Sequence, residues 1–164
     1  MQITRRDALK AGALGLATTA SSQAQVPRAE LNPTFKVTKG RIRQSVMGWC
    51  FKPMTAVELA KHCKAIGLEA MEGISRADYP AVRKLGLKIS LVGSHGFKKG
   101  PFSKANHEYC VKRLKAGIDL AVEVNCPSVI TFTGMREKGT KDAEGERNCV
   151  ELWKSVIGYA EKKK

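Results

Sequence analysis

Two hydrophobic periods take turns along the chain from about residue 43. Short runs in which apolar and polar residues alternate predict strands, and longer runs with apolar residues three or four apart predict amphipathic helices. The strands are expected over residues 44–49, 68–74, 87–92 and 128–133. The helices are expected over residues 55–66, 78–85, 104–124 and 142–162. Each expected strand is therefore followed by an expected helix.

The ends and faces of these helices carry their own signals. Thr55 with Glu58 three residues later is a capping-box pattern, and Gly67 stands where the first helix should end. Pro127 breaks the chain before the fourth expected strand. The stripes expected to be buried are Leu59, Cys63 and Ile66 in the first helix, Cys110, Leu114, Ile118, Ala121 and Val122 in the third, and Val150, Trp153, Ile157 and Ala160 in the fourth.

The alternating order of strands and helices predicts an α/β fold with a parallel sheet and right-handed crossovers. Four units of about 30 residues each match the unit length of a (β/α)8 barrel of roughly 250 residues. We therefore expect the N-terminal half of such a barrel. A four-stranded open sheet is the alternative. Its dinucleotide-binding form is disfavoured because the first strand-to-helix turn, residues 48–53, lacks the glycine pattern G-x-G-x-x-G.

Residues 1–24 have the pattern of an export signal. Arg5 and Arg6 precede an apolar, charge-free run over residues 11–20, and small residues follow where a signal peptidase reads. The segment resembles twin-arginine signals, so we expect export to the periplasm. The apolar run is shorter than the roughly 20 residues that span a bilayer, which disfavours a permanent membrane anchor. Residues 25–42 have no sustained period and are expected to be a linker or arm, which leaves residues 43–164 as the partial barrel.

Composition leaves the expected fold unchanged and bears on the protein surface and its partners. The chain has 43% hydrophobic and 27% charged residues, the balance of a soluble globular protein. Lys and Arg number 29 against 15 Asp and Glu, for a net charge of +14, so anionic partners are favoured. Aromatic residues make up only 6% of the chain, too few to interleave with the basic ones, and nucleic acid is therefore disfavoured.

The cysteines point to packing rather than to chemistry. There are 5 of them, an odd number without a CxxC pair, which argues against a disulfide framework and against a zinc ribbon. Cys63, Cys110 and Cys149 fall on the apolar stripes of expected helices. We expect these three to be buried thiols that act as small hydrophobic side chains.

Four short motifs at the expected strand and helix junctions carry a resemblance to a known family. They are GWCFKPM at residues 48–54, GSHG at 93–96, VITFTG at 129–134 and EGERNCV at 144–150. Together they resemble hydroxypyruvate isomerases and related sugar isomerases and epimerases of the xylose isomerase-like TIM-barrel group. The resemblance runs from about Arg43 to Lys163.

The resemblance implies a chemistry. Interconverting a hydroxy-ketone and a hydroxy-aldehyde moves a proton between adjacent carbons through an enediolate, which calls for a carboxylate base and a divalent metal such as Mg²⁺ or Mn²⁺. In the resembled family these ligands and carboxylates come from the ends of the fifth to eighth strands. We therefore expect this chain to be incomplete, to hold no cofactor by itself and to be inactive alone, as a natural half barrel or as an incomplete gene product.

The candidate site residues follow the four expected strands. Glu72 and His95 are the carboxylate and the imidazole at strand ends, and two such ligands fall short of a catalytic zinc site. The alternatives are that Glu72 caps a helix or pairs with Arg76, and that His95 bonds to loop backbone. Trp49, Cys50 and Phe51 are expected either to wall a substrate pocket or to pack under the first loop. Lys98 lies where it could attract a carboxylate or a phosphate.

Two classes of function stay open on these residues. The first is an isomerase of small anionic hydroxy-keto acids or sugars, with self-association through the open edges of the half barrel. The second is an exported, non-enzymatic module that binds an anionic small molecule or polymer through its basic charge.

Overall fold

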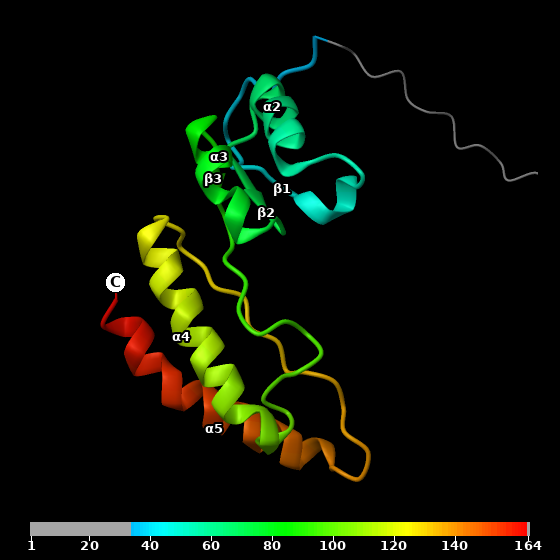
Figure 1. Ribbon diagram of the computed structural model, residues 1–164, viewed down its shortest axis with the longest axis vertical. Helices are drawn as coiled ribbons and strands as arrows, with labels where there is room; N and C mark the ends of the chain where they lie inside the picture. Colours follow the sequence, from blue (N-terminus) through cyan, green and yellow to red (C-terminus); the bar gives the residue numbers. More distant parts are fainter. Residues whose placement is uncertain (1–33, 164) are drawn as a thin grey trace, which may run out of the picture. The chain divides into compact units, whose positions relative to one another are not determined.

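The computed structural model describes residues 34–163 (Figure 1). The expected signal and residues 25–33 of the expected arm lie outside the described residues. The chain divides into two units, Met1–Phe35 and Lys36–Lys164, and only Thr34 and Phe35 of the first are described. The fold described below is that of the second unit.

A small parallel sheet forms the first part of this unit. Its strands are β1 (Ser45–Met47), β2 (Ala70–Glu72) and β3 (Lys88–Ile89), in the order β1-β2-β3. Val46 lies opposite Met71, and Met71 lies opposite Ile89. Each strand therefore pairs with the strand that follows it in the sequence, and the chain has the predicted mixed α/β character.

The fourth expected strand, residues 128–133, is not formed, so this prediction was wrong. The segment meets the chain that leaves β3 through a single parallel bridge between Val92 and Val129. The Val92 amide donates to the Ser128 carbonyl and the Ile130 amide to the Val92 carbonyl, both at 2.9 Å. Beyond this bridge, Ser94 and His95 bond to residues 130 and 131 through their side chains, and the Phe102 amide bonds to the Thr133 carbonyl. The fourth segment still lies beside the third.

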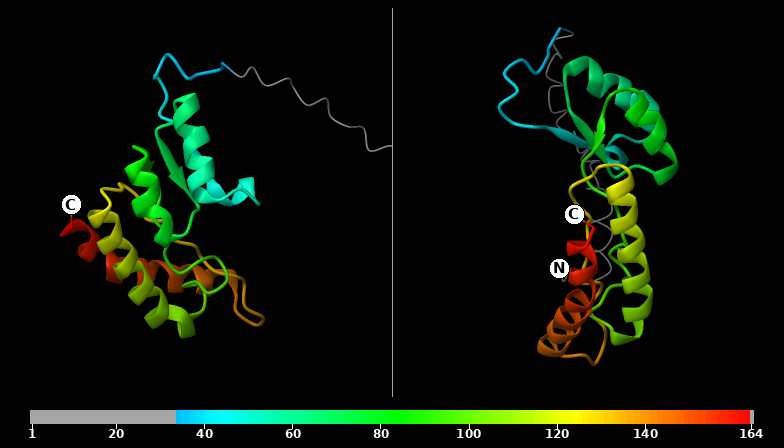
Figure 2. Two further views of the ribbon diagram at one scale, coloured as in Figure 1. Left: turned by 45° about the horizontal axis from the view of Figure 1, so that its top comes forward. Right: turned by 90° about the vertical axis from the view of Figure 1, so that its left-hand side faces the viewer.

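Four α-helices lie within the described residues: α2 (Ala56–Ile66), α3 (Tyr79–Lys84), α4 (His107–Glu123) and α5 (Asp142–Glu161). The predicted capping box is confirmed, since the Glu58 amide donates to Thr55 Oγ1 at 3.2 Å and the Thr55 amide to Glu58 Oε2 at 2.8 Å. Gly67 ends α2 in the left-handed conformation, with φ of 85°. α2 contacts α3, and α4 contacts α5 (Figure 2).

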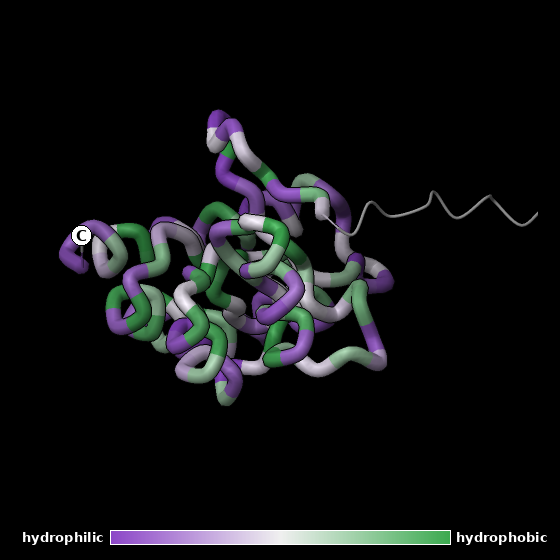
Figure 3. Tube along the Cα trace, turned by 90° about the horizontal axis from the view of Figure 1, so that it is seen from above, coloured by the Kyte–Doolittle hydropathy of each residue, from purple (hydrophilic) through white to green (hydrophobic). Residues whose placement is uncertain are grey.

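The core has two hydrophobic clusters. The first joins the sheet to α2, α3 and the end of α4, and its members include Leu59, Cys63, Met71, Val82, Ile89, Val92 and Ala121. The second fills the space between α4 and α5, with Cys110, Leu114, Ile118, Leu152 and Val156. Hydrophobic and hydrophilic positions alternate around the helical turns, as amphipathic helices require (Figure 3). No helix of residues 34–163 is long and apolar enough to cross a membrane.

The buried face of α5 differs from the predicted one. Cys149, Leu152 and Val156 are buried, whereas Val150 and Ile157 keep 40% and 59% of their surface exposed. The reason is that α5 carries two apolar stripes one residue apart, and α4 covers only one of them. Two smaller corrections are of the same kind: Ile66 and Val122, predicted to be buried, are exposed.

Candidate functional site

Glu72 is the last residue of β2, at the edge where parallel strands end. Its carboxylate is half-buried and accepts a hydrogen bond from Ser90 Oγ at 3.0 Å. Ser90 follows β3, so the bond joins two neighbouring strand ends. Arg76, the alternative partner considered from the sequence, instead donates to the Gly93 carbonyl at 2.7 Å. The carboxylate is thus oriented by a neutral donor.

Trp49 brings an exposed aromatic face to the same edge. It lies in the 3-10 turn η2 (Gly48–Phe51) that follows β1, and 60% of its surface is exposed. Its indole lies against Gly73, where a Cβ would come within 2.7 Å of Trp49 Cδ1. Gly73 also has a φ of 63°, a backbone conformation that residues other than glycine rarely adopt. Because Gly73 has no side chain, the Trp49 indole can lie against the backbone next to Glu72.

Phe51 and Cys50 are not gathered with these residues into one pocket. Cys50 is exposed. Phe51 is 45% exposed and lines a shallow depression of about 660 Å³ with residues of η2, the next turn and α2, namely Lys52, Pro53, Met54, Glu58 and His62. Neither Glu72 nor His95 lines this depression. The three neighbours Trp49, Cys50 and Phe51 thus point to different surroundings.

His95 is buried, with 6% of its surface exposed, and both ring nitrogens have partners. Nδ1 lies 2.8 Å from the Gly96 carbonyl and 3.0 Å from the Lys99 carbonyl. Because carbonyls only accept, Nδ1 carries the hydrogen. In the neutral ring Nε2 then accepts the hydroxyl hydrogen of Thr131, at 3.0 Å. His95 is therefore bonded to loop backbone and orients Thr131.

Thr131 is the exposed member of this chain of hydrogen bonds. Its Oγ1 accepts from Trp153 Nε1 at 3.1 Å while its own hydrogen goes to His95. The hydroxyl is held in one direction by a donor from α5 and by an acceptor from the loop after β3. One acceptor lone pair of this oxygen stays available.

We call residues 94–102 together with residues 130–134 the clasp. Ser94 Oγ donates to the Ile130 carbonyl, and the Phe102 amide donates to the Thr133 carbonyl at 2.8 Å. Gly100 and Gly134 touch through their backbones, with no room for a side chain on either. The clasp thus joins the chain that follows β3 to the fourth segment, residues 128–133. Lys98 lies on it and is exposed.

The described residues do not fit the divalent metal that the family resemblance implies. Within residues 34–163 no three His, Cys, Asp or Glu side chains lie close enough together to hold a metal ion. Glu72 bonds to Ser90, and His95 has both nitrogens engaged. No step through a metal is derived from these residues.

Three buried thiols add no nucleophile to this edge. Cys63, Cys110 and Cys149 are buried as predicted, and burial raises the pKa of each. A raised pKa keeps a thiol protonated near neutral pH and therefore unreactive.

Three residues that bond to the candidate site residues, directly or through Thr131, were not singled out from the sequence: Ser90, Thr131 and Trp153. Thr131 stands in the VITFTG motif, and that motif was the available signal. Trp153 was interpreted as a core residue, and Ser90 as part of a strand. Comparison with known proteins assigns none of these roles: no protein-family model matches the chain, and no curated protein matches it.

Proposed function

We propose that residues 43–163 adopt the first four units of a xylose isomerase-like barrel and supply the substrate-binding edge of an isomerase or epimerase site. The substrate class is a small hydroxy-keto acid or sugar. The observation that carries the proposal is the Glu72 carboxylate, which Ser90 orients, next in sequence to Gly73, against which the exposed indole of Trp49 lies.

The order of the strands supports the barrel. In a dinucleotide-binding doubly wound sheet the strand order reverses at a switch point, which brings the fourth strand beside the first. Here the strands follow the order β1-β2-β3, and Val129 of the fourth segment pairs with Val92 of the chain leaving β3. Winding in a single direction favours the barrel type.

The side chains at the strand ends suit a polyol. A carboxylate accepts hydrogen bonds from hydroxyl groups, and an exposed aromatic face covers the apolar C–H side of the same molecule. Thr131 adds a hydroxyl oxygen with a free lone pair. In the isomerisation, such groups bind and orient the hydroxyls of the carbons between which the proton moves.

The test is isothermal titration calorimetry, which measures the affinity of the chain for hydroxypyruvate. Glu72→Gln should weaken binding about tenfold, since a hydrogen bond to a charged group contributes roughly 1.5–3 kcal/mol. Glu69→Gln is the matched control, because Glu69 directly precedes β2, away from the end that carries Glu72, and the substitution changes the net charge equally. Equal affinities of the two variants would overturn the proposal.

A second titration separates this proposal from the anion-binding module. Dihydroxyacetone is neutral, so an edge that recognises hydroxyls through Glu72 should bind it with the same dependence on Glu72. A module that recognises charge through exposed lysines such as Lys98 should instead bind inorganic phosphate, with an affinity that falls as salt is added. Glu72→Gln should leave that affinity unchanged.

A further inference from the structure

The helix α5 has an apolar face that the described residues cover only in part. Val150 and Ile157 are 40% and 59% exposed, and Trp153 between them is half-buried because it packs against the cluster between α4 and α5. The same helix buries Cys149, Leu152 and Val156 against α4. A helix that is apolar on two sides suits a position between two neighbours.

The exposed residues have the spacing of a helix-packing seam. Ala143, Val150 and Ile157 are exposed and follow one another at intervals of seven, and Trp153 comes three residues after Val150. This is the a and d pattern by which one helix packs along another. The pattern points to a helix as the partner of this face.

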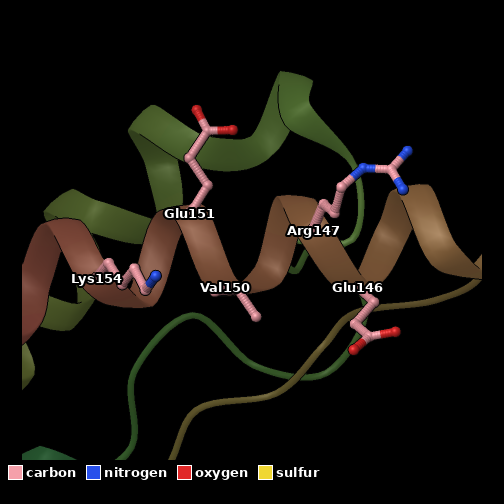
Figure 4. A pocket seen from close by; sticks show the side chains of 5 residues that line it. All are labelled: Glu146, Arg147, Val150, Glu151 and Lys154. Carbon is pink, nitrogen blue, oxygen red and sulfur yellow. The ribbon is translucent and has the colours of Figure 1, made fainter.

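Val150 lies at the centre of the face, in a depression of about 390 Å³. Figure 4 shows Val150 and Glu146 pointing to one side of the helix, with Arg147 and Glu151 pointing to the opposite side. Glu146 and Lys154 also line the depression, each four residues from Val150. Neither of these two charges forms an ion pair within residues 34–163.

Glu146 and Lys154 lie at equal distances from Val150, four residues before it and four residues after it. In an antiparallel pair of identical helices, residues at equal distances on the two sides of the twofold axis face one another. With a twofold axis at Val150, each Glu146 faces Lys154 of the second copy, which satisfies both unpaired charges.

We infer that α5 is a self-association surface, on which a second copy of this chain docks its own α5 antiparallel about a twofold axis at Val150. A twofold interface must be complementary to itself, and this charge pattern has that property. The seam is small, since a helix of 20 residues is about 30 Å long. The dimer therefore belongs to the weak, concentration-dependent class of interfaces.

The test is sedimentation velocity on the full chain over about two decades of concentration around the micromolar range, where weak interfaces dissociate. The sedimenting mass should rise from one copy to two. Val150→Asp and Ile157→Glu should each abolish the rise, because they place a charge in the apolar seam. Val122→Asp is the matched control, since Val122 is 52% exposed on α4 and lies outside the seam.

A charge exchange tests the orientation. Glu146→Lys and Lys154→Glu should each weaken the dimer about tenfold by placing like charges opposite one another, and the double variant should restore it. Circular dichroism of each variant checks that the fold is intact. A chain that stays monomeric throughout, a dimer indifferent to Val150→Asp, or a double variant without recovery would overturn the inference.

Discussion

Residues 45–89 and the clasp both bring extended segments side by side, but different atoms hold them together. In residues 45–89 the backbone ladder sets the register, and Met71 packs beneath it with no exposed surface. In the clasp a single backbone bond, from Phe102 to Thr133, is joined by side-chain bonds of Ser94, His95 and Thr131 and by two touching glycines. A backbone ladder tolerates many sequences, whereas a clasp of this kind depends on particular residues.

We therefore expect residues 45–89 to contribute mainly to the stability of the fold and the clasp mainly to the geometry of the candidate site. The ladder derives its stability from buried apolar surface, which any side chains of similar volume supply. The clasp instead fixes polar groups at the ends of the strands, where Thr131 is exposed. Each of the following variants disturbs one of these regions, and the measurement shows whether the other region changes as well.

Met71→Ala should have the largest effect, because it opens a cavity under the ladder between β1 and β3. Buried Met to Ala changes lower the free energy of unfolding by about 2–5 kcal/mol. Urea denaturation measures the loss. Met54→Ala, at a methionine that is 38% exposed, is the control and should cost less than about 1 kcal/mol. Similar losses in the two variants would contradict the proposed role of the ladder.

Gly100→Ala should come next and act on the clasp. The added methyl group would collide with the backbone of Gly134, and such overpacking costs about 1–3 kcal/mol. Hydrogen exchange should accelerate at the Phe102 amide, which bonds to Thr133, and stay slow in β2. Gly93→Ala, where a Cβ meets open space, is the matched control. Acceleration in β2 of equal size would show that the two regions open together.

Thr131→Val should have a smaller effect. It removes the oxygen that joins His95 Nε2 to Trp153 Nε1, at a cost of about 1 kcal/mol in the free energy of unfolding. Chemical denaturation measures the change. Thr133→Val is the control, since its hydroxyl bonds only to the adjacent Gly134 carbonyl. A loss no larger than in the control would mean that His95 is positioned without Thr131.

The smallest expected effect concerns the surface between α4 and α5. Hydrogen bonds from Lys163 and then Tyr159 lower the pKa of Asp119 below its ordinary 3.8, and the bond to Asp119 raises the pKa of Lys163 above its ordinary 10.5. The carboxylate therefore adds stability that is present above pH 3.8 and is lost as the pH falls through its lowered pKa. The ammonium adds stability that is present below pH 10.5 and is lost as the pH rises through its raised pKa.

Asp119→Asn should thus lower the melting temperature slightly at neutral pH and have no effect at strongly acidic pH. Thermal melts across this range measure the difference between the two proteins. Glu123→Gln, an exposed carboxylate on the same helix, is the control. A difference that persists unchanged into strong acid would contradict the ion-pair explanation.

The parts of the fold that depend on neighbouring residues were predictable from the sequence. α2 begins at a capping box and ends at Gly67 because Thr55, Glu58 and the glycine satisfy the helix ends locally. The order of strands and helices followed from the two hydrophobic periods. For the same reason Cys63 and Cys110 could be placed in the core.

The parts that depend on distant residues were not predictable. The fourth segment looked like a strand because its apolar residues alternate, but Ser94 and His95, some 36 residues earlier, bond to it through side chains. The buried face of α5 was misassigned because α4 decides which apolar stripe is covered. Glu72 and His95 could be proposed as site residues from their positions after expected strands, whereas their hydrogen-bond partners Ser90 and Thr131 became visible only in three dimensions.

The chain contains 2 tryptophans, and their placement gives each region its own optical reporter. Trp49 lies at the ladder, 60% exposed, and Trp153 is half-buried with its indole N–H bonded into the clasp. An indole in water emits at longer wavelength than one in apolar surroundings, so the two emissions separate. With Trp49 or Trp153 replaced by phenylalanine, the remaining fluorescence follows one region alone as the chain unfolds.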